Sequence, residues 1–197
     1  MTRVAALGFW IALLVPPGVQ ADAPLKPEGA FGARVILLDK PLPVPDYTFE
    51  ERRADGTRRE WGMIEFRGRV VVLNFWATWC RICERELPKF DRLAAALADD
   101  KIDMLALSLD EEIEETATTL ASRGHRNLRV LRDPDSVLST LMGVSGVPTT
   151  FVVGPDGRAL AAVEGPADWH SKEALAWLRS LAGSATSRAP EAPVKTH

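Results

Sequence analysis

Cysteine and histidine are scarce in this chain, which has two cysteines and three histidines among 197 residues. A structural zinc site usually takes four such ligands, commonly as two close pairs. His125, His170 and His197 are not paired at ligand spacing, so no metal site is expected, and each is interpreted as a solvated loop or tail residue. Residue 84 is a glutamate, which excludes the CxxCH pattern of haem attachment.

An excess of positive charge is also missing. The 24 Lys and Arg residues are outnumbered by 27 Asp and Glu residues, which gives a formal net charge of −3. Nucleic acid is therefore not expected as a partner, because such a surface would need a basic face. The chain is 46% hydrophobic, which is enough for one domain with a core, and it is too short for two comfortable domains.

Residues 1–21 are typical of an export signal. Arg3 and the amino terminus supply a minimal positive charge, and Val4–Val15 is an apolar run too short to span a bilayer easily. A Pro-Pro-Gly sequence then ends any helix, and Val19 and Ala21 suit cleavage after residue 21. We therefore expect a periplasmic protein, with an uncleaved membrane anchor or a buried first helix as the alternatives.

The rest of the chain divides by composition. Residues 22–45 are rich in proline and predict a linker or a packed arm, in which residues 34–38 can form a short edge strand. Residues 46–182 form the predicted domain, which opens with a hairpin around Asp55-Gly56. Residues 183–197 are polar and contain proline, so a disordered tail is expected.

Strands and helices alternate through the predicted domain. Residues 69–77 and 101–109 are near-continuous apolar runs, typical of strands buried on both faces of a sheet. The other predicted elements are helices at 82–97 and 113–121, a short strand at 128–133, a helix capped by Asp133, a hairpin through Gly154–Gly157 and a last helix capped by Ser171. This order predicts an α/β sandwich with parallel strands early and an antiparallel hairpin late.

The two cysteines, Cys80 and Cys83, lie directly after the first buried strand. A bridge between them would close almost no loop and would stabilise little, which argues against a structural staple. The amino end of a helix stabilises a thiolate. We therefore predict that Cys80, at the first helical position and facing outward, is the attacking thiolate. Cys83, facing the core beside Ile82, would resolve the mixed disulfide.

Glu86 lies one helical turn after Cys83. A carboxylate at this place can exchange protons with the thiols or raise their pKa, and the alternative is a solvated helix residue. Two tryptophans flank the motif: Trp79 is a candidate cover over the disulfide, whereas Trp76 is expected in the core.

Two segments together carry a resemblance to a known family. NFWATWCRICERELP and GVSGVPTTFVVGPDGRAL resemble the two signatures of the thioredoxin superfamily, in its exported TlpA/ResA/CcmG-like branch, and the similarity covers roughly residues 46–182. The resemblance implies a thioredoxin-like three-layer α/β sandwich with an N-terminal hairpin and a helix–strand insertion at residues 110–133. It also implies a cis peptide between Val147 and Pro148, packed against the cysteine pair and available to bind a substrate backbone.

Three positions depart from the family pattern. Asn74 stands where thioredoxin has a buried aspartate, which makes Glu86 the better candidate for the proton-handling carboxylate. Ile82 replaces the usual proline before the second cysteine. Arg81 places a cation beside Cys80, which favours the thiolate and therefore makes the couple more oxidising.

The predicted function is a periplasmic thiol-disulfide oxidoreductase, acting as a reductase of protein disulfides, for example in cytochrome c maturation or on metal-site cysteines. The redox centre is the Cys80–Cys83 disulfide, with no other cofactor, and the resemblance implies a membrane thiol carrier as the electron donor. A monomer is expected. The alternatives are a disulfide oxidase or isomerase, and a copper-handling assembly chaperone, although no methionine cluster supports the latter.

Overall fold

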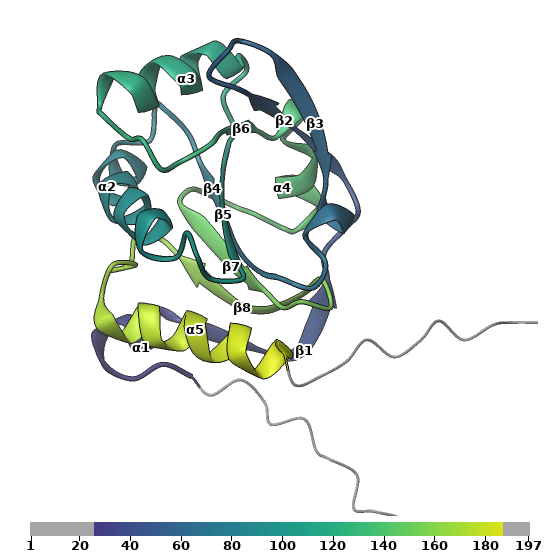
Figure 1. Cartoon of the computed structure of the whole chain (residues 1–197), viewed down its shortest axis with the longest axis vertical. Coiled ribbons are helices and arrows are strands. Elements are labelled where there is room, and N and C mark those ends of the chain that lie inside the picture. Colours follow the sequence, from purple (N-terminus) through teal and green to yellow (C-terminus); the bar gives the residue numbers. More distant parts are fainter. Residues whose placement is uncertain (1–25, 187–197) are drawn as a thin grey trace, which may run out of the picture.

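The computed structural model describes residues 26–186, so the predicted export signal lies outside the described residues. Eight strands form one sheet in the order β1-β8-β7-β4-β5-β6-β2-β3 (Figure 1). In chain order these strands are β1 (Ile36–Pro43), β2 (Thr48–Arg52), β3 (Arg58–Gly62), β4 (Val70–Trp76), β5 (Ile102–Ser108), β6 (Val130–Arg132), β7 (Thr149–Val153) and β8 (Arg158–Glu164). The helices are α1 (Gly29–Arg34), η1 (Met63–Phe66), α2 (Arg81–Ala96), α3 (Ile113–Ser122), η2 (Pro134–Ser136), α4 (Val137–Leu141) and α5 (Lys172–Thr186).

The centre of the sheet is the apolar run predicted from the sequence. Every residue of β4 is buried, and this strand runs parallel to β5 and antiparallel to β7. Its side chains alternate between two cores: Val70 and Trp76 belong to one, whereas Phe75 belongs to the other. A strand that feeds two cores needs apolar residues at consecutive positions, which explains why the run has no polar alternation.

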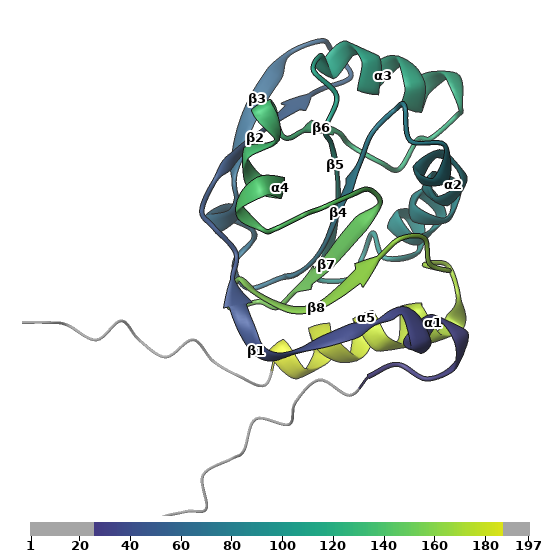
Figure 2. The same ribbon diagram turned by 180° about the vertical axis from the view of Figure 1, so that it is seen from behind.

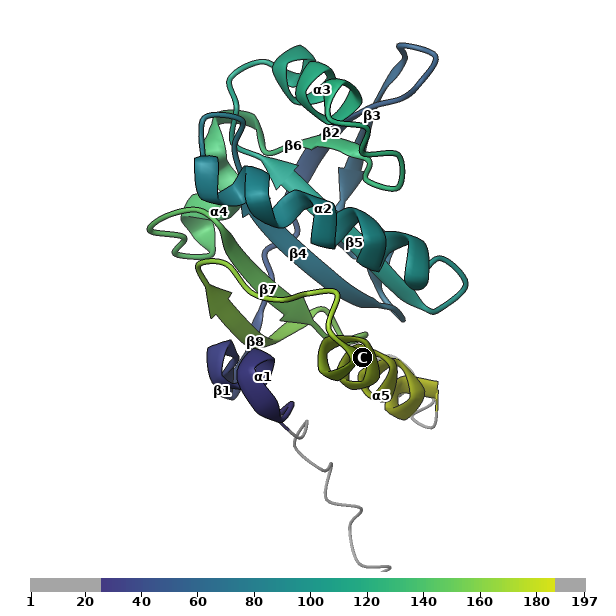
Figure 3. The ribbon, with the colours of Figure 1, turned by 90° about the vertical axis from the view of Figure 1, so that its left-hand side faces the viewer.

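Helices cover both faces of the sheet. In Figures 1 and 3, α2 lies on one face of the central strands and α4 lies on the other, and Figure 2 shows the second face from behind. Buried residues of α2 and α5 share the core that contains Trp76, whereas Leu138 of α4 packs in the core that contains Phe75. The fold is therefore the predicted thioredoxin-like three-layer sandwich, with the N-terminal hairpin β2–β3 joined to the sheet through β6.

The turns and the insertion also follow the prediction. Gly56 has a φ of +84° in the β2–β3 turn, a conformation that favours glycine. The insertion at residues 110–133 supplies α3 and β6, and β6 pairs in parallel with β5. The helix expected after Asp133 is split into η2 and α4, because Asp135 and Ser136 both have a φ of +54°. The Asp133 carboxylate still caps it, accepting from Leu138 N at 3.0 Å and Ser139 N at 2.8 Å.

The two ends of the described chain pack together. Residues 29–43 of the proline-rich arm form α1 and the edge strand β1, which pairs antiparallel with β8. Helix α5 continues to Thr186, so residues 183–186 of the predicted tail are helical, a correction to the expected boundary. Residues 187–197 lie outside the described residues. Within residues 26–186, no helix combines the length and the hydropathy needed to cross a bilayer.

Candidate active site

The cysteine pair lies where β4 ends and α2 begins. Cys80 is the N-cap of α2 rather than its first helical residue, and its Sγ accepts a hydrogen bond from Cys83 N at 3.1 Å. The two sulfurs form a disulfide. Because the Cys83 N–H points at Cys80 Sγ and the amino end of a helix carries partial positive charge, this position stabilises negative charge on that sulfur.

Burial distinguishes the two cysteines. Cys80 is 8% exposed and Cys83 is 1% exposed, so both are buried, Cys80 does not face outward as expected, and it is the more accessible of the two. Ile82 is 43% exposed and faces outward, which corrects its expected place beside Cys83 in the core. The inward face of α2 is formed instead by Cys83, Glu86, Leu87, Phe90 and Leu93.

A cis peptide links Val147 to Pro148, as the resemblance implied. The Val147 carbonyl oxygen lies 3.7 Å from Cys80 Sγ. Pro148 directly precedes β7, whose amino end lies beside the carboxyl end of β4 because the two strands are antiparallel. The backbone before β7 therefore lies against the more accessible sulfur.

The other predicted residues of the motif occupy different environments. Trp79 is 71% exposed, so most of its ring faces solvent, and Arg81 is also exposed. Trp76 is fully buried, as predicted, and donates its indole N–H to Ala106 O at 3.2 Å. Asn74 is buried and donates to Thr150 Oγ1 at 3.0 Å, which joins β4 to β7.

Glu86 is buried, with 4% of its surface exposed, and this excludes its interpretation as a solvated helix residue. Its Oε1 accepts from Ala167 N at 2.9 Å and from Trp169 Nε1 at 3.0 Å. Burial raises the pKa of Glu86 to about 7, although these two hydrogen bonds and the charges of Lys89 and Arg34 oppose the rise. A carboxyl group with this pKa changes protonation near neutral pH, and it lies on the same helix face as Cys83.

A second buried carboxylate was not singled out from the sequence. Asp110 accepts from Thr78 N at 3.0 Å, from Thr78 Oγ1 at 2.9 Å and from Thr116 Oγ1 at 3.1 Å, and the Ser108 hydroxyl also donates to it. Thr78 lies two residues before Cys80. Asp110 thus ties the active-site turn to β5 and α3. Its position just past the carboxyl end of a buried strand, next to that turn, was the signal that could have identified it.

The histidines lie apart from this arrangement. His125 is half-buried, not solvated as expected, and burial lowers its pKa. His170 is exposed, and His197 lies outside the described residues. Among residues 26–186, no group of three His, Cys, Asp or Glu side chains is placed to hold a metal ion.

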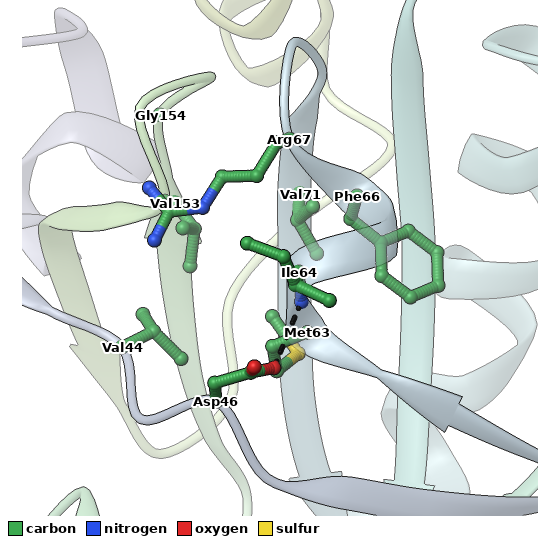
Figure 4. Close-up of a pocket in the computed structure, with 10 residues that line it drawn as sticks. Val44, Asp46, Met63, Ile64, Phe66, Arg67, Val71, Val153 and Gly154 are labelled. Carbon is green, nitrogen blue, oxygen red and sulfur yellow. Dashed lines mark hydrogen bonds between the residues drawn. The ribbon is translucent and has the colours of Figure 1, made fainter. Parts of the chain in front are cut away.

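Figure 4 shows a small cavity of about 10 Å³. It lies near Val71 at the start of β4, whereas the cysteines follow the end of that strand. Val71 and Val153 line it, and Asp46 reaches across its rim to accept from Ile64 N at 3.1 Å. This volume suits at most one water molecule, so the cavity is no site for a small-molecule cofactor.

The fold and the site together define the class of protein: a thioredoxin-like domain with a CxxC disulfide at the amino end of α2. The chain belongs to the AhpC/TSA family, whose model matches residues 42–160, more than half of the chain.

Two known proteins with related sequences are both named for thiol–disulfide chemistry. Thiol-disulfide oxidoreductase ResA of Geobacillus thermodenitrificans is 28% identical over 121 residues, which cover 61% of this chain and 67% of that protein. Thiol:disulfide interchange protein HelX of Rhodobacter capsulatus is 33% identical over 99 residues, which cover 50% of this chain and 54% of that protein. The chain thus spans between about half and two thirds of the length of these relatives.

Solved structures with similar folds include a thiol:disulfide interchange protein DsbE from Chlorobium tepidum. It matches with a TM-score of 0.59 at 26% identity, over 72% of this chain and 99% of that chain. The exposed lipoprotein thioredoxin Etrx1 of Streptococcus pneumoniae matches with a TM-score of 0.53 at 28% identity, over 68% of this chain and all of that chain.

Proposed function

We propose that the protein is an exported thiol-disulfide oxidoreductase that reduces disulfides in other proteins. The observation that carries this proposal is the placement of Cys80: it caps α2, its sulfur accepts the Cys83 N–H, and it is the more exposed of the two cysteines. A pair in this setting is poised for thiol–disulfide exchange, because the attacking species is the thiolate. The names of the ResA and HelX relatives agree with this chemistry.

The reaction proceeds through two exchanges. In the reduced protein, the Cys80 thiolate attacks one sulfur of the client disulfide, which forms a mixed disulfide and releases the first client thiolate. Cys83 then loses its proton and attacks Cys80 Sγ, which closes the Cys80–Cys83 disulfide and releases the second client thiolate. Two electrons pass from the protein to the client, and each released thiolate takes up a proton.

Glu86 is the proposed partner for the proton of Cys83. Cys83 is almost fully buried, so its proton cannot pass freely to water. Glu86 lies one turn away on the same face of α2, and its pKa of about 7 suits a group that accepts a proton and returns it near neutral pH. Its carboxylate would take the proton during the second exchange and would pass it on as the client thiolate leaves.

The client would bind beside the cis peptide. The Val147 carbonyl lies against Cys80 Sγ, and an extended client backbone can pair with groups next to Pro148 as an added strand does. Trp79 and Ile82, which are 71% and 43% exposed, offer apolar contacts around the pair. Such contacts would favour clients that present apolar side chains near their disulfide.

Electrons would reach the oxidised protein from a membrane thiol carrier, as the resemblance to the exported branch implies. Residues 1–21 would direct the export. Suitable clients are exported proteins whose cysteines must be reduced before they bind haem or a metal.

Oxidation of client thiols, the reverse reaction, is the second candidate function, because Arg81 and the amino end of α2 both favour the Cys80 thiolate. A stabilised reduced form makes a couple more oxidising. The reduction potential, measured by equilibration with glutathione, decides between the two directions: about −270 mV supports the reductase, and about −120 mV supports an oxidase.

The exchange mechanism is tested by trapping. Cys80→Ser should abolish reduction of a model protein disulfide, whereas Cys83→Ser should accumulate a mixed disulfide through Cys80, visible by mass spectrometry under non-reducing conditions. If Cys83→Ser forms no mixed disulfide, the assigned roles of the two cysteines are wrong. Captured clients from periplasmic extracts would then identify the substrates.

A further inference from the structure

Glu86 is held by a loop that is far from it in sequence. The segment between β8 and α5 supplies both hydrogen bonds, one from Ala167 N at 2.9 Å and one from Trp169 Nε1 at 3.0 Å. Both N–H groups point at the same oxygen, Oε1. An oxygen that accepts two hydrogen bonds has its lone pairs engaged, so the other oxygen, Oε2, is the one available to take and release a proton.

The direction of the indole N–H is fixed by aromatic packing. Trp169 is fully buried. The Phe31 ring of α1 packs edge-on against it with a centroid distance of 5.1 Å, and the Phe90 ring of α2 lies 5.3 Å away at a tilt of 57°. With neighbours on two sides, the indole cannot turn without breaking these contacts, and its N–H therefore stays aimed at Glu86.

The loop that carries Trp169 is anchored where it leaves β8. Gly165 N donates to Pro148 O at 2.8 Å, which ties the loop to the cis-proline segment. Arg34, the last residue of α1, donates to Glu164 O at 2.6 Å. A Cβ atom on Gly165 would lie 2.8 Å from the Arg34 guanidinium, and Gly165 has a φ of +74°, so glycine permits this close approach.

The charged groups around Glu86 come from three elements. Lys89 on α2 and Arg34 at the end of α1 both lower its pKa. Asp168, in the loop itself, forms an ion pair with Lys89 at 3.3 Å, with both side chains partly exposed. These charges act at a distance and are screened by water, whereas the Trp169 hydrogen bond acts on one chosen oxygen.

We propose that Trp169 is a positioning residue for Glu86: its indole N–H, oriented by Phe31 and Phe90, holds Oε1 and leaves Oε2 for proton exchange with Cys83. This inference rests on the proposed function and deepens it, since it gives the N-terminal arm a part in the site. The arm supplies Phe31 to orient the indole and Arg34 to anchor the loop.

The test uses the fully reduced protein and dithiobis(nitrobenzoate), a small disulfide that releases one coloured thiolate at each of the two exchanges. The first equivalent reports the attack of Cys80, and the second reports the attack of Cys83 on the mixed disulfide. The rate of the second release is measured by stopped flow between pH 5 and pH 9. In the wild type, this rate should rise with pH through an inflection near the Glu86 pKa of about 7.

Trp169→Phe keeps an aromatic ring between Phe31 and Phe90 and removes the N–H. Because that hydrogen bond stabilises the ionised carboxylate, its loss should move the inflection upward by about one pH unit and slow the second release at pH 7 several-fold. The first release should keep its wild-type rate.

Trp177→Phe is the matched control. Trp177 also packs on Phe31, at 6.1 Å between centroids, and its buried Nε1 has no hydrogen-bond partner among the described residues. The same substitution there should leave the inflection unchanged. An equal shift in both variants would mean that general loosening of the packing is responsible, and this would overturn the inference.

Glu86→Gln tests the proton-transfer role of Glu86 separately from the positioning role of Trp169. If Glu86→Gln loses the inflection and Trp169→Phe keeps the wild-type one, Glu86 handles the proton but Trp169 does not position it. If Glu86→Gln keeps the inflection, the role of Glu86 fails and the inference fails with it. If the wild type releases only one equivalent, the exchange mechanism itself is wrong.

A measurement on the unmodified protein covers the case in which Trp169→Phe does not fold. The indole ¹⁵N–¹H signal of Trp169, assigned through its contacts with Phe90, should move with pH about a midpoint near the Glu86 pKa of about 7, whereas the Trp177 signal should not. A Trp169 signal that stays constant through this range contradicts the positioning role.

Discussion

Glu86 and Asp110 are both buried carboxyl groups that flank the cysteine motif, and they use their oxygens in different ways. Asp110 has both oxygens engaged by hydroxyl and backbone donors from the active-site turn, β5 and α3. Glu86 accepts two N–H groups on Oε1 alone. The hydrogen bonds of Asp110 join the active-site turn to β5 and α3, whereas those of Glu86 would leave Oε2 for the proposed proton exchange.

The contrast shows that burial alone does not give a carboxyl group its role. Both side chains are less than 5% exposed. Hydroxyl groups can rotate to donate, so Asp110 is satisfied as an acceptor from several directions. Glu86 accepts from fewer donors, and both of them are fixed N–H groups. Their lowering effect on its pKa is smaller than the rise caused by burial. Three substitutions test this comparison, in order of decreasing expected effect.

Asp110→Ala should lower the free energy of unfolding by on the order of 4 kcal/mol, because the Thr78 N–H and three hydroxyl groups lose their common acceptor. Urea unfolding of the oxidised protein at pH 7 measures this loss. Asp110→Asn keeps one acceptor oxygen and should lose less. A loss below about 1 kcal/mol for Asp110→Ala would mean that water replaces the carboxylate fully and that Asp110 does not hold the turn.

Glu86→Gln should remove a pH dependence of stability. The pKa is about 7 in the folded protein, compared with an ordinary value of 4.5. Between these pH values the folded state keeps a proton on Glu86 that the unfolded state has lost. The stability that Glu86 contributes is therefore fully present below about pH 4.5 and is lost as the pH rises through about 7. The wild type should therefore lose about 3 kcal/mol over that range relative to Glu86→Gln.

The measurement is urea unfolding of both oxidised proteins at pH 4.5, 6 and 8. The amide side chain introduced by Glu86→Gln would keep an acceptor oxygen for Ala167 N and Trp169 Nε1, so the variant should be the more stable protein at pH 8. Parallel pH profiles for the two proteins would contradict the raised pKa of Glu86.

Glu84→Gln provides the less buried counterpart, because 23% of the Glu84 side chain is exposed. Glu84 lies in the first turn of α2 and forms an ion pair with Arg123, whose side chain is 45% exposed. Ion pairs that solvent reaches contribute little, so the expected change in the free energy of unfolding is below about 1 kcal/mol at any pH between 5 and 8. A loss comparable to that of Asp110→Ala would show that proximity to the motif, and not the burial of the carboxylate, determines the effect.

Local patterns predicted the elements and the reactive pair. The apolar run before Cys80, the Asp55-Gly56 turn and the hairpin tip at Gly154–Gly157 each depend on nearby residues, and each is present. The cis peptide at Val147–Pro148 came from the resemblance and not from the residues themselves, and it too is present.

Contacts between distant segments could not be predicted in the same way. Asp110 and Thr78 are 32 residues apart, and Trp169 and Glu86 are 83 apart. No periodicity marks such pairs, because they meet only after the strands align. The orientation of Ile82 was mispredicted for a related reason: the apolar stripe of α2 includes Glu86, a residue whose charge suggested solvent.

The prolines of the N-terminal arm have a consequence for self-association. An edge strand presents unpaired N–H and C=O groups that can recruit a strand from another molecule. Strand β1 forms one edge of the sheet and contains Pro41 and Pro43, which have no N–H to offer, and its pairing with β8 is irregular between Leu37 and Leu42. At the other edge, β3 presents charged residues at 58–60. Both edges thus carry features that oppose strand addition, so copies of this protein are discouraged from pairing with each other at the margins of the sheet.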